Sequence, residues 1–90
     1  MKIKDLLKTK QDWTQGTLAR DKDGNAHFSE TNSTSWCLGG AIERCYPNRK
    51  IRNKVHLDVV GIIKMEIADW NDDPKRTFAD VRKLIEEMDI

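Results

Sequence analysis

One thiol and one imidazole in this sequence could together carry out nucleophilic chemistry. Cys37 lies in the first turn of a predicted helix, where the helix dipole stabilises a thiolate, and His56 could serve as its base if two helices pack together. The sequence contains neither a G-x-S-x-G nucleophile elbow nor an H-E-x-x-H zinc motif. Because a free cysteine is more often a small buried hydrophobe, a catalytic Cys37–His56 pair is the less favoured interpretation.

Carboxylates gather in a second stretch, around Trp70. Asp69, Asp72 and Asp73 offer the oxygen ligands that Mg²⁺ and other hard cations prefer. However, no phosphate-binding glycine loop accompanies them, and Asp and Asn side chains commonly bond neighbouring backbone groups in turns. The cysteines and histidines also lack the C-x2-C or H-x3-H spacing of a zinc site. We therefore favour a structural loop, and we predict neither a metal nor a cofactor.

Cations form a third group. The segment from residue 44 to residue 56 contains no acidic residue, and its candidate binding residues are Arg44, Tyr46, Arg49, Lys50, Arg52 and Lys54. Such a cluster can meet nucleic-acid phosphates or an acidic protein surface. The whole chain has a formal net charge of only +1, whereas DNA-binding domains are usually far more basic. A solvated surface is the plainest explanation, and among partners an acidic protein is favoured over nucleic acid.

Charge is also divided unevenly along the chain. Residues 1–54 contain 11 Lys and Arg against 6 Asp and Glu, whereas residues 55–90 contain 5 against 9. The two halves can complement each other within one fold or between subunits. The sequence therefore leaves a homo-oligomer open.

A short central helix is predicted for Ser33–Cys45, with an N-cap among residues 33–35. Gly39 and Gly40 each cost roughly 1 kcal/mol relative to alanine in a helix interior, so we expect another backbone to approach closely or the helix to bend. Cysteines eight residues apart on a helix are separated by about 12 Å, whereas a disulfide needs Cα atoms within about 7 Å. Both cysteines should therefore be reduced and buried.

Periodicity predicts further elements on either side. A first helix over residues 3–14 precedes a short β-hairpin or irregular loop near residues 17–28 and a polar linker over residues 29–35. A longer helix follows over residues 51–69, and a last helix, capped by Thr77, runs to Met88.

Two polar residues interrupt the apolar stripe of the 51–69 helix. We expect His56 to lie at the edge of the core and bond a backbone carbonyl, and Glu66 to reach solvent or Arg44. The predicted core comprises Trp13, Trp36, Leu38, Ile42, Val59, Ile63, Ile67, Trp70, Phe78, Val81 and Ile85.

Length and composition favour one small globular domain over residues 1–90. The predicted fold is mainly α, a compact bundle of about four helices with a minor hairpin or loop. No apolar run approaches the ~18 residues of a membrane-spanning helix, and the start M-K-I-K-D-L-L-K lacks the apolar core of a signal peptide. With only two cysteines, we expect a cytoplasmic protein without membrane contact.

Four sequence blocks follow one another along the chain. They are W-T-Q-G at Trp13–Gly16, A-R-D-x-x-G at Ala19–Gly24, W-C-L-G-G-A at Trp36–Ala41 and W-N-D-D-P-x-R-T at Trp70–Thr77. Together they resemble a family of small bacterial and phage proteins that is classed as a domain of unknown function. The resemblance covers about Leu6 to Met88 and implies a shared fold and ancestry. It brings no activity with it.

The expected function is that of a small protein-interaction module, for example an accessory or inhibitor protein of a phage or mobile element. Weak nucleic-acid binding through residues 44–54 is the first alternative. A small enzyme that uses Cys37 and His56, or the acidic loop, is the second.

Overall fold

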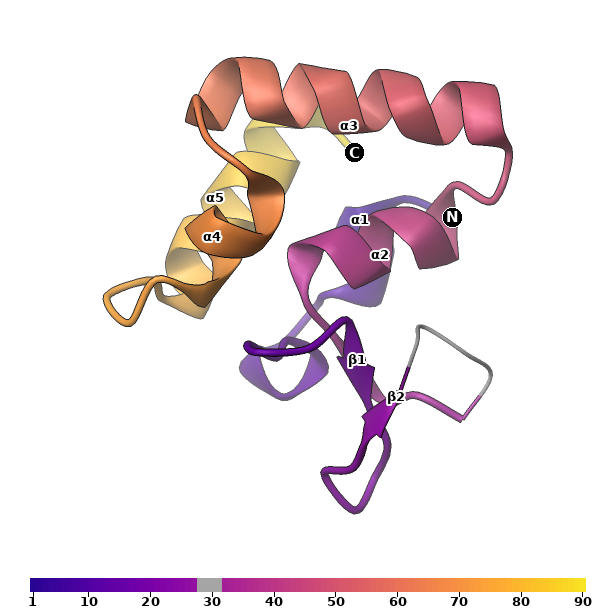
Figure 1. Ribbon diagram of the computed structural model, residues 1–90, viewed down its shortest axis with the longest axis vertical. Helices are drawn as coiled ribbons and strands as arrows, with labels where there is room; N and C mark the ends of the chain where they lie inside the picture. Colours follow the sequence, from indigo (N-terminus) through magenta and orange to yellow (C-terminus); the bar gives the residue numbers. More distant parts are fainter. Residues whose placement is uncertain (28–31) are drawn as a thin grey trace.

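The computed structural model describes residues 1–27 and 32–90, as helices around a small sheet (Figure 1). In chain order its elements are α1 (Ile3–Leu6), the 3-10 helix η1 (Lys10–Asp12), β1 (Ala19–Arg20), β2 (Ala26–His27), β3 (Ser35–Trp36), α2 (Leu38–Cys45), α3 (Arg49–Ile63), α4 (Ile67–Asp72) and α5 (Phe78–Met88). The prediction of a mainly α protein with a minor hairpin is confirmed. A four-helix bundle is not, because the described residues form five α-helices, of which α1 and α4 are very short.

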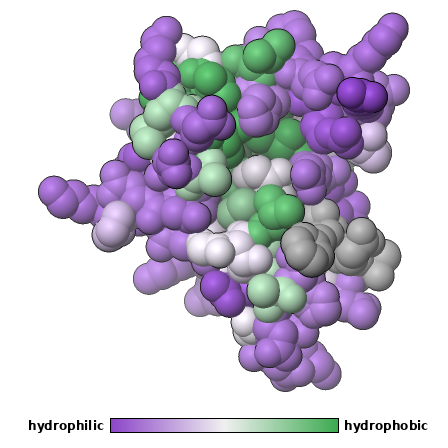
Figure 2. All heavy atoms as spheres, viewed as in Figure 1, coloured by the Kyte–Doolittle hydropathy of each residue, from purple (hydrophilic) through white to green (hydrophobic). Residues whose placement is uncertain are grey.

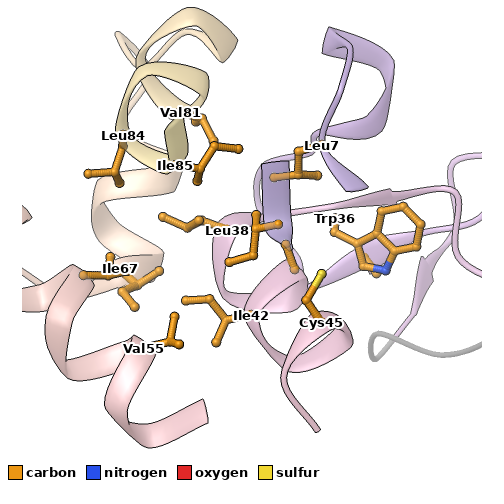
Figure 3. Close-up of a cluster of buried hydrophobic side chains, with 14 residues drawn as sticks. Leu7, Trp36, Leu38, Ile42, Cys45, Val55, Ile67, Val81, Leu84 and Ile85 are labelled. Carbon is orange, nitrogen blue, oxygen red and sulfur yellow. The ribbon is translucent and has the colours of Figure 1, made fainter. Parts of the chain in front are cut away.

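Helix α2 supplies the centre of the core. Its residue Leu38 lies between the apolar side chains of α5 on one side and Leu7 and Trp36 on the other, and Ile42 lies beside Val55 of α3 (Figure 3). Burial of such side chains stabilises the fold by roughly 1.5–3 kcal/mol each. Of the predicted core residues, the structure buries Trp36, Leu38, Ile42, Val59, Ile67, Val81 and Ile85, and packs Trp13, Ile63, Trp70 and Phe78 against them half-buried. Both cysteines are free and buried, as their spacing predicts.

The small sheet has the strand order β2-β1-β3, antiparallel throughout. Ala19 of β1 lies opposite His27 on one side and Trp36 on the other. The turn between β1 and β2 follows the expected chemistry, because Asp21 accepts backbone hydrogen bonds within it and Gly24 has a φ of 84°. The predicted hairpin is therefore present, whereas the third strand was not expected. Part of the predicted linker over residues 29–35 lies outside the described residues.

The predicted central helix begins too early. Ser35 and Trp36 form a strand instead, and α2 starts only after Cys37. The N-cap is not one of residues 33–35, because Cys37 takes that position and its sulfur accepts a hydrogen bond from Gly40 N at 3.2 Å. Sheet pairing with β1 fixes Trp36 in an extended conformation, and this tertiary contact overrides the helical spacing.

The predicted helix over residues 3–14 is also wrong. It is divided into α1 and η1, because Asp12 Oδ2 accepts from the backbone N–H of Thr9 at 2.9 Å and starts a new turn there. Trp13 is extended and forms an isolated parallel bridge with Trp36. The first segment thus runs along the sheet rather than along a continuous helix.

The predicted helix over residues 51–69 is two helices in the structure. Helix α3 ends at Ile63, and Lys64 adopts a left-handed conformation with a φ of 61°. The chain then turns into α4, which brings Ile67 into the core from a different direction. His56 is exposed on α3, so its predicted place at the core edge is wrong, whereas Glu66 reaches solvent as predicted. Within the described ranges, no helix is long and apolar enough to span a bilayer.

Candidate functional site

A buried asparagine organises the side of the molecule where the sheet meets α2 and α4. Asn71 is 0% exposed, and its Oδ1 accepts hydrogen bonds from Trp13 Nε1 at 2.8 Å and from Leu38 N at 2.9 Å. Its Nδ2 donates to Thr14 O at 3.1 Å and to Asp72 Oδ1 at 2.9 Å. Both lone-pair positions and both N–H groups of the amide are therefore satisfied. We call the segments that this side chain joins the Asn71 junction.

Neighbouring polar groups extend the Asn71 junction. Gln15 Nε2 donates to Asn71 O at 2.8 Å and to Asp73 O at 3.1 Å. Gly16 N donates to Asp72 Oδ1 at 2.9 Å. The segment that precedes the sheet is thus held along the end of α4 by hydrogen bonds from both its backbone and its side chains.

The carboxylates of the acidic loop, which are those of Asp69, Asp72 and Asp73, do not converge on one point. The loop instead supports the Asn71 junction. Asp72 accepts from Gly16 and Asn71, Asp73 Oδ1 accepts from Lys75 N at 2.9 Å, and Asp69 lies exposed on α4. Over residues 1–27 and 32–90, no group of three or more acidic, histidine or cysteine side chains is arranged to hold a metal ion. The structure therefore gives Asp72 and Asp73 backbone partners, the chemistry expected of a structural loop.

Two arginines brace the same region. Arg76 stacks over Trp70 with its guanidinium carbon 4.0 Å from the ring centroid, and its Nε donates to Trp70 O at 2.8 Å. Arg20 donates to Thr14 Oγ1 at 2.8 Å and to Gln15 O at 3.0 Å. Both cations thus hold the backbone of segments that lead into the Asn71 junction.

A close backbone approach completes the junction. A Cβ atom on Gly40 would lie 2.1 Å from Leu18 O, so only glycine fits where α2 meets the chain leading into β1. The backbone there is tied by a hydrogen bond from Cys37 N to Leu18 O at 3.0 Å. One of the two adjacent glycines therefore has the role that the sequence predicted.

A groove opens next to the Asn71 junction, where α2 meets α3 and α4. Its volume is about 280 Å³. Its apolar lining comes from Leu18, Cys37, Gly39, Ile42, Ile67 and Ala68, with Ile42 and Ile67 buried at its floor, and its polar lining comes from Glu43, Arg52, Asn53, His56 and Glu66. Figure 2 shows hydrophobic surface gathered over α3 and in the hollow beneath it, with hydrophilic side chains around it. We call this hollow the α3 groove.

The family model described as a family of unknown function, DUF6197, matches residues 1–88. The chain belongs to this family. No curated protein and no solved structure matches it significantly. In this DUF6197 chain, the four sequence blocks quoted above lie in the Asn71 junction or bond to its segments, through Trp13–Gly16, Arg20, Cys37–Gly40 and Trp70–Arg76. The blocks therefore describe the architecture of the fold.

The structure brings Cys37 and His56 to one place, because both line the α3 groove. Their chemistry differs from that of an activated pair. Burial raises the pKa of the Cys37 thiol above its usual value, so the neutral thiol is favoured near pH 7. The Cys37 sulfur also accepts the hydrogen bond that caps α2. In this DUF6197 chain, the Cys37 sulfur thus acts as the N-cap of α2.

The basic segment, residues 44–54, lies across the turn from α2 into α3. Arg44, Arg49 and Lys50 are exposed. Lys54 forms an ion pair with Asp58 at 2.8 Å, and Tyr46 is not part of the basic surface, since its hydroxyl donates to Ile90 O at 2.8 Å. Four cations of the segment are therefore exposed, Arg44, Arg49, Lys50 and Lys54, and the last of them is already paired with a carboxylate.

Arg52 connects the basic segment to the α3 groove. It is half-buried, its Nη1 donates to Pro47 O at 3.3 Å, and its side chain lines the groove one helical turn beyond Arg49. The sequence identified Arg52 as a basic residue but did not place it beside an apolar hollow. Asn71 was missed altogether as an organising residue. Its only sequence signal was its position in the W-N-D-D block, between Trp70 and Asp72.

Proposed function

We propose that the protein is a small protein-interaction module that binds an acidic surface of its partner through the basic segment. The observation that carries this proposal is the charge at the start of α3. The first turn of this helix contains Arg49, Lys50 and Arg52 and no acidic residue.

This arrangement opposes the electrostatics of the helix itself. A helix N-terminus carries a partial positive charge, and an unfavourable charge there costs typically 0.3–1 kcal/mol. Helix α3 is capped by Asn48, whose Oδ1 accepts from Lys50 N at 3.0 Å and from Ile51 N at 3.2 Å, so its start is well formed despite the three cations. Carboxylates of a partner would offset both the cations and the dipole. The repulsion within the free protein is thereby relieved in the complex.

A protein partner suits this surface better than nucleic acid. Large apolar side chains stand exposed on α3: Ile51, within the basic segment, at 52%, and Leu57 and Ile62, further along the helix, at 68% and 56%. Apolar groups beside cations favour a mixed protein surface, whereas phosphate backbones are met chiefly by Lys, Arg and polar donors. The chain's net charge of +1 also supplies little of the general attraction on which nucleic-acid binding depends.

The proposal extends to the setting of the protein. Two buried free thiols suit a reducing compartment, so we place the protein in the bacterial cytoplasm. There it would act as an accessory or inhibitor protein, as expected for a phage or mobile element, and self-association through its oppositely charged halves is left open.

Selection from a library of displayed random peptides tests the proposal. We expect enrichment of peptides rich in Asp and Glu, whose binding weakens at high salt because the attraction is screened. A double charge reversal, Arg49→Glu with Lys50→Glu, should weaken binding at least about tenfold, a loss of about 1.4 kcal/mol.

The matched control reverses two exposed lysines outside the basic segment, Lys22→Glu with Lys75→Glu. It applies the same change in net charge, so its affinity should stay near that of the wild type. Equal binding by all three proteins would contradict the proposal. Tighter, salt-dependent binding of a labelled DNA or RNA duplex than of any selected peptide would favour the nucleic-acid alternative.

A further inference from the structure

We infer that the α3 groove receives one large apolar side chain of the same acidic partner, so that the recognised element is a short peptide with an apolar anchor beside its acidic residues. This inference rests on the proposed function and specifies the partner's chemistry.

The dimensions and lining of the groove favour a single side chain. Pockets for whole drug-sized ligands usually measure about 300–1,000 Å³, and this groove, at about 280 Å³, is at the lower end of that range. Its apolar lining includes aliphatic groups of Leu18, Ile42 and Ile67. Removal of apolar surface from water would be the main gain when a leucine, phenylalanine or similar side chain enters it.

Charge complementarity orders the peptide relative to the groove. Arg52 of α3 borders the groove next to the basic segment, whereas Glu43 borders it from α2 and Glu66 from the start of α4. Acidic residues of the peptide would therefore follow α3 toward Arg49 and Lys50, and like-charge repulsion would disfavour acids on the α4 side. The anchor and the acids are thus adjacent in the peptide because the groove and Arg52 are adjacent in the protein.

Gly39 provides an independent observation in favour of an occupant. A Cβ atom there would lie 3.8 Å from Cys37 Sγ and 3.9 Å from side-chain atoms of both Ile67 and Leu18, all ordinary contacts. Alanine is the better helix former and would fit, so neither packing nor backbone conformation requires glycine at this position. The missing methyl group leaves the floor of the groove open. At Gly40, by contrast, the backbone of Leu18 excludes any side chain.

Filling the groove tests the inference. Gly39→Leu places a side chain in it from α2, and Ala68→Trp does so from the exposed side of α4, so that one variant remains informative if the other folds poorly. Circular dichroism and thermal melting of each variant establish its fold. The probes are one selected acidic peptide, synthesised as such, and the same peptide with its apolar residue replaced by alanine.

On the wild-type protein, loss of the anchor should weaken binding about tenfold to a hundredfold, the range expected for burial of one large apolar side chain. On Gly39→Leu and Ala68→Trp, both peptides should bind with the weaker affinity, and the difference between them should largely disappear. Gly39→Ala should lie between the wild type and Gly39→Leu.

The inference is overturned if the selected acidic peptides share no apolar residue, or if the anchor contributes equally to binding by the wild type and the filled variants. In either case, continued sensitivity to Arg49→Glu with Lys50→Glu would leave the proposed function standing. Loss of the charge dependence itself would instead overturn the proposed function, together with the inference that rests on it.

Discussion

The Asn71 junction and the α3 groove, which adjoin each other at helix α2, differ in how completely their polar groups and space are filled. At the Asn71 junction, the amide of Asn71 makes four hydrogen bonds and the backbone of Leu18 fills the space next to Gly40. At the α3 groove, one turn of the same helix borders a hollow, and the neighbouring Gly39 leaves space that a methyl group could occupy. A site whose buried polar groups are all hydrogen-bonded stabilises the fold, whereas an open site with mixed charges and an apolar floor is suited to binding.

The first turns of α5 and α3 also differ from each other, in this case in the sign of their charged side chains. Thr77 caps α5, and Asp80 stands in its first turn, where a carboxylate is favoured by the dipole. The Thr77 N–H donates to Asp80, and this bond is the first cause of the lowered pKa of that carboxyl. Helix α3 instead carries cations in its first turn. One helix start is arranged for stability, and the other retains an electrostatic cost.

The largest effect should come from the buried amide. Asn71→Ala leaves the N–H groups of Trp13 and Leu38 without their acceptor, and each unsatisfied buried group costs about 1–3 kcal/mol. We expect a loss of about 3–5 kcal/mol in the free energy of unfolding, measured by urea denaturation. His56→Ala at the groove rim is the matched control and should change stability little. A small loss of stability in Asn71→Ala would remove the distinction between the Asn71 junction and the α3 groove.

Adjacent glycines give the second test. Gly40→Ala should cost about 3 kcal/mol, because the added Cβ meets the backbone of Leu18 and the chain must move apart. Gly39→Ala should be neutral or stabilising by up to about 1 kcal/mol, since alanine fits and favours the helix. Thermal melting of the two single variants makes the comparison directly. Similar losses at both positions would mean that Gly39 is also needed for packing.

The extent to which the sequence predicted these features depends on how local their signals are. The Thr77 cap with Asp80 was predictable because the two residues that bond each other are three positions apart. The hairpin turn at Asp21 and Gly24 was predictable for the same reason. The end of α3 was not, because Lys64 takes the left-handed conformation that usually calls for glycine or asparagine.

Long-range contacts explain the remaining differences between the predicted and the observed structure. Asn71 bonds Trp13 across 58 positions of the chain, and no periodicity within either segment predicts that pairing. Trp36 opens an apolar set whose separations are mostly three or four residues, which indicates a helix, but pairing with β1 makes Trp36 part of a strand. The α3 groove depends on how α2, α3 and α4 meet, so Gly39 and Arg52 could be named from the sequence without being placed together.

Capping should contribute equally at the two helix starts. Thr77→Ala removes the acceptor for Asp80 N, and Asn48→Ala removes the acceptor for Lys50 N and Ile51 N. Each variant should lose about 1 kcal/mol in urea denaturation. Equal losses would show that α3 differs from α5 in charge and not in capping. A negligible loss from Asn48→Ala would mean that the start of α3 is held by other contacts.

The smallest effect should have the opposite sign. Lys50→Glu should raise the free energy of unfolding by about 0.3–1 kcal/mol, because it replaces an unfavourable cation by a favourable anion at the start of α3. The part of the gain that comes from the new carboxylate should be present at neutral pH. It should be lost as the pH falls below about 4.3, since a glutamate stabilised in the folded state has a lowered pKa there. Lys83→Glu, exposed in the middle of α5, is the control and should give no such gain, because the effect of the helix dipole falls off beyond the first and last turns. If Lys50→Glu raises the stability and also weakens the binding of acidic peptides, the electrostatic cost at the start of α3 is linked to the proposed binding function. A loss of stability would show that the cations are already compensated within the fold.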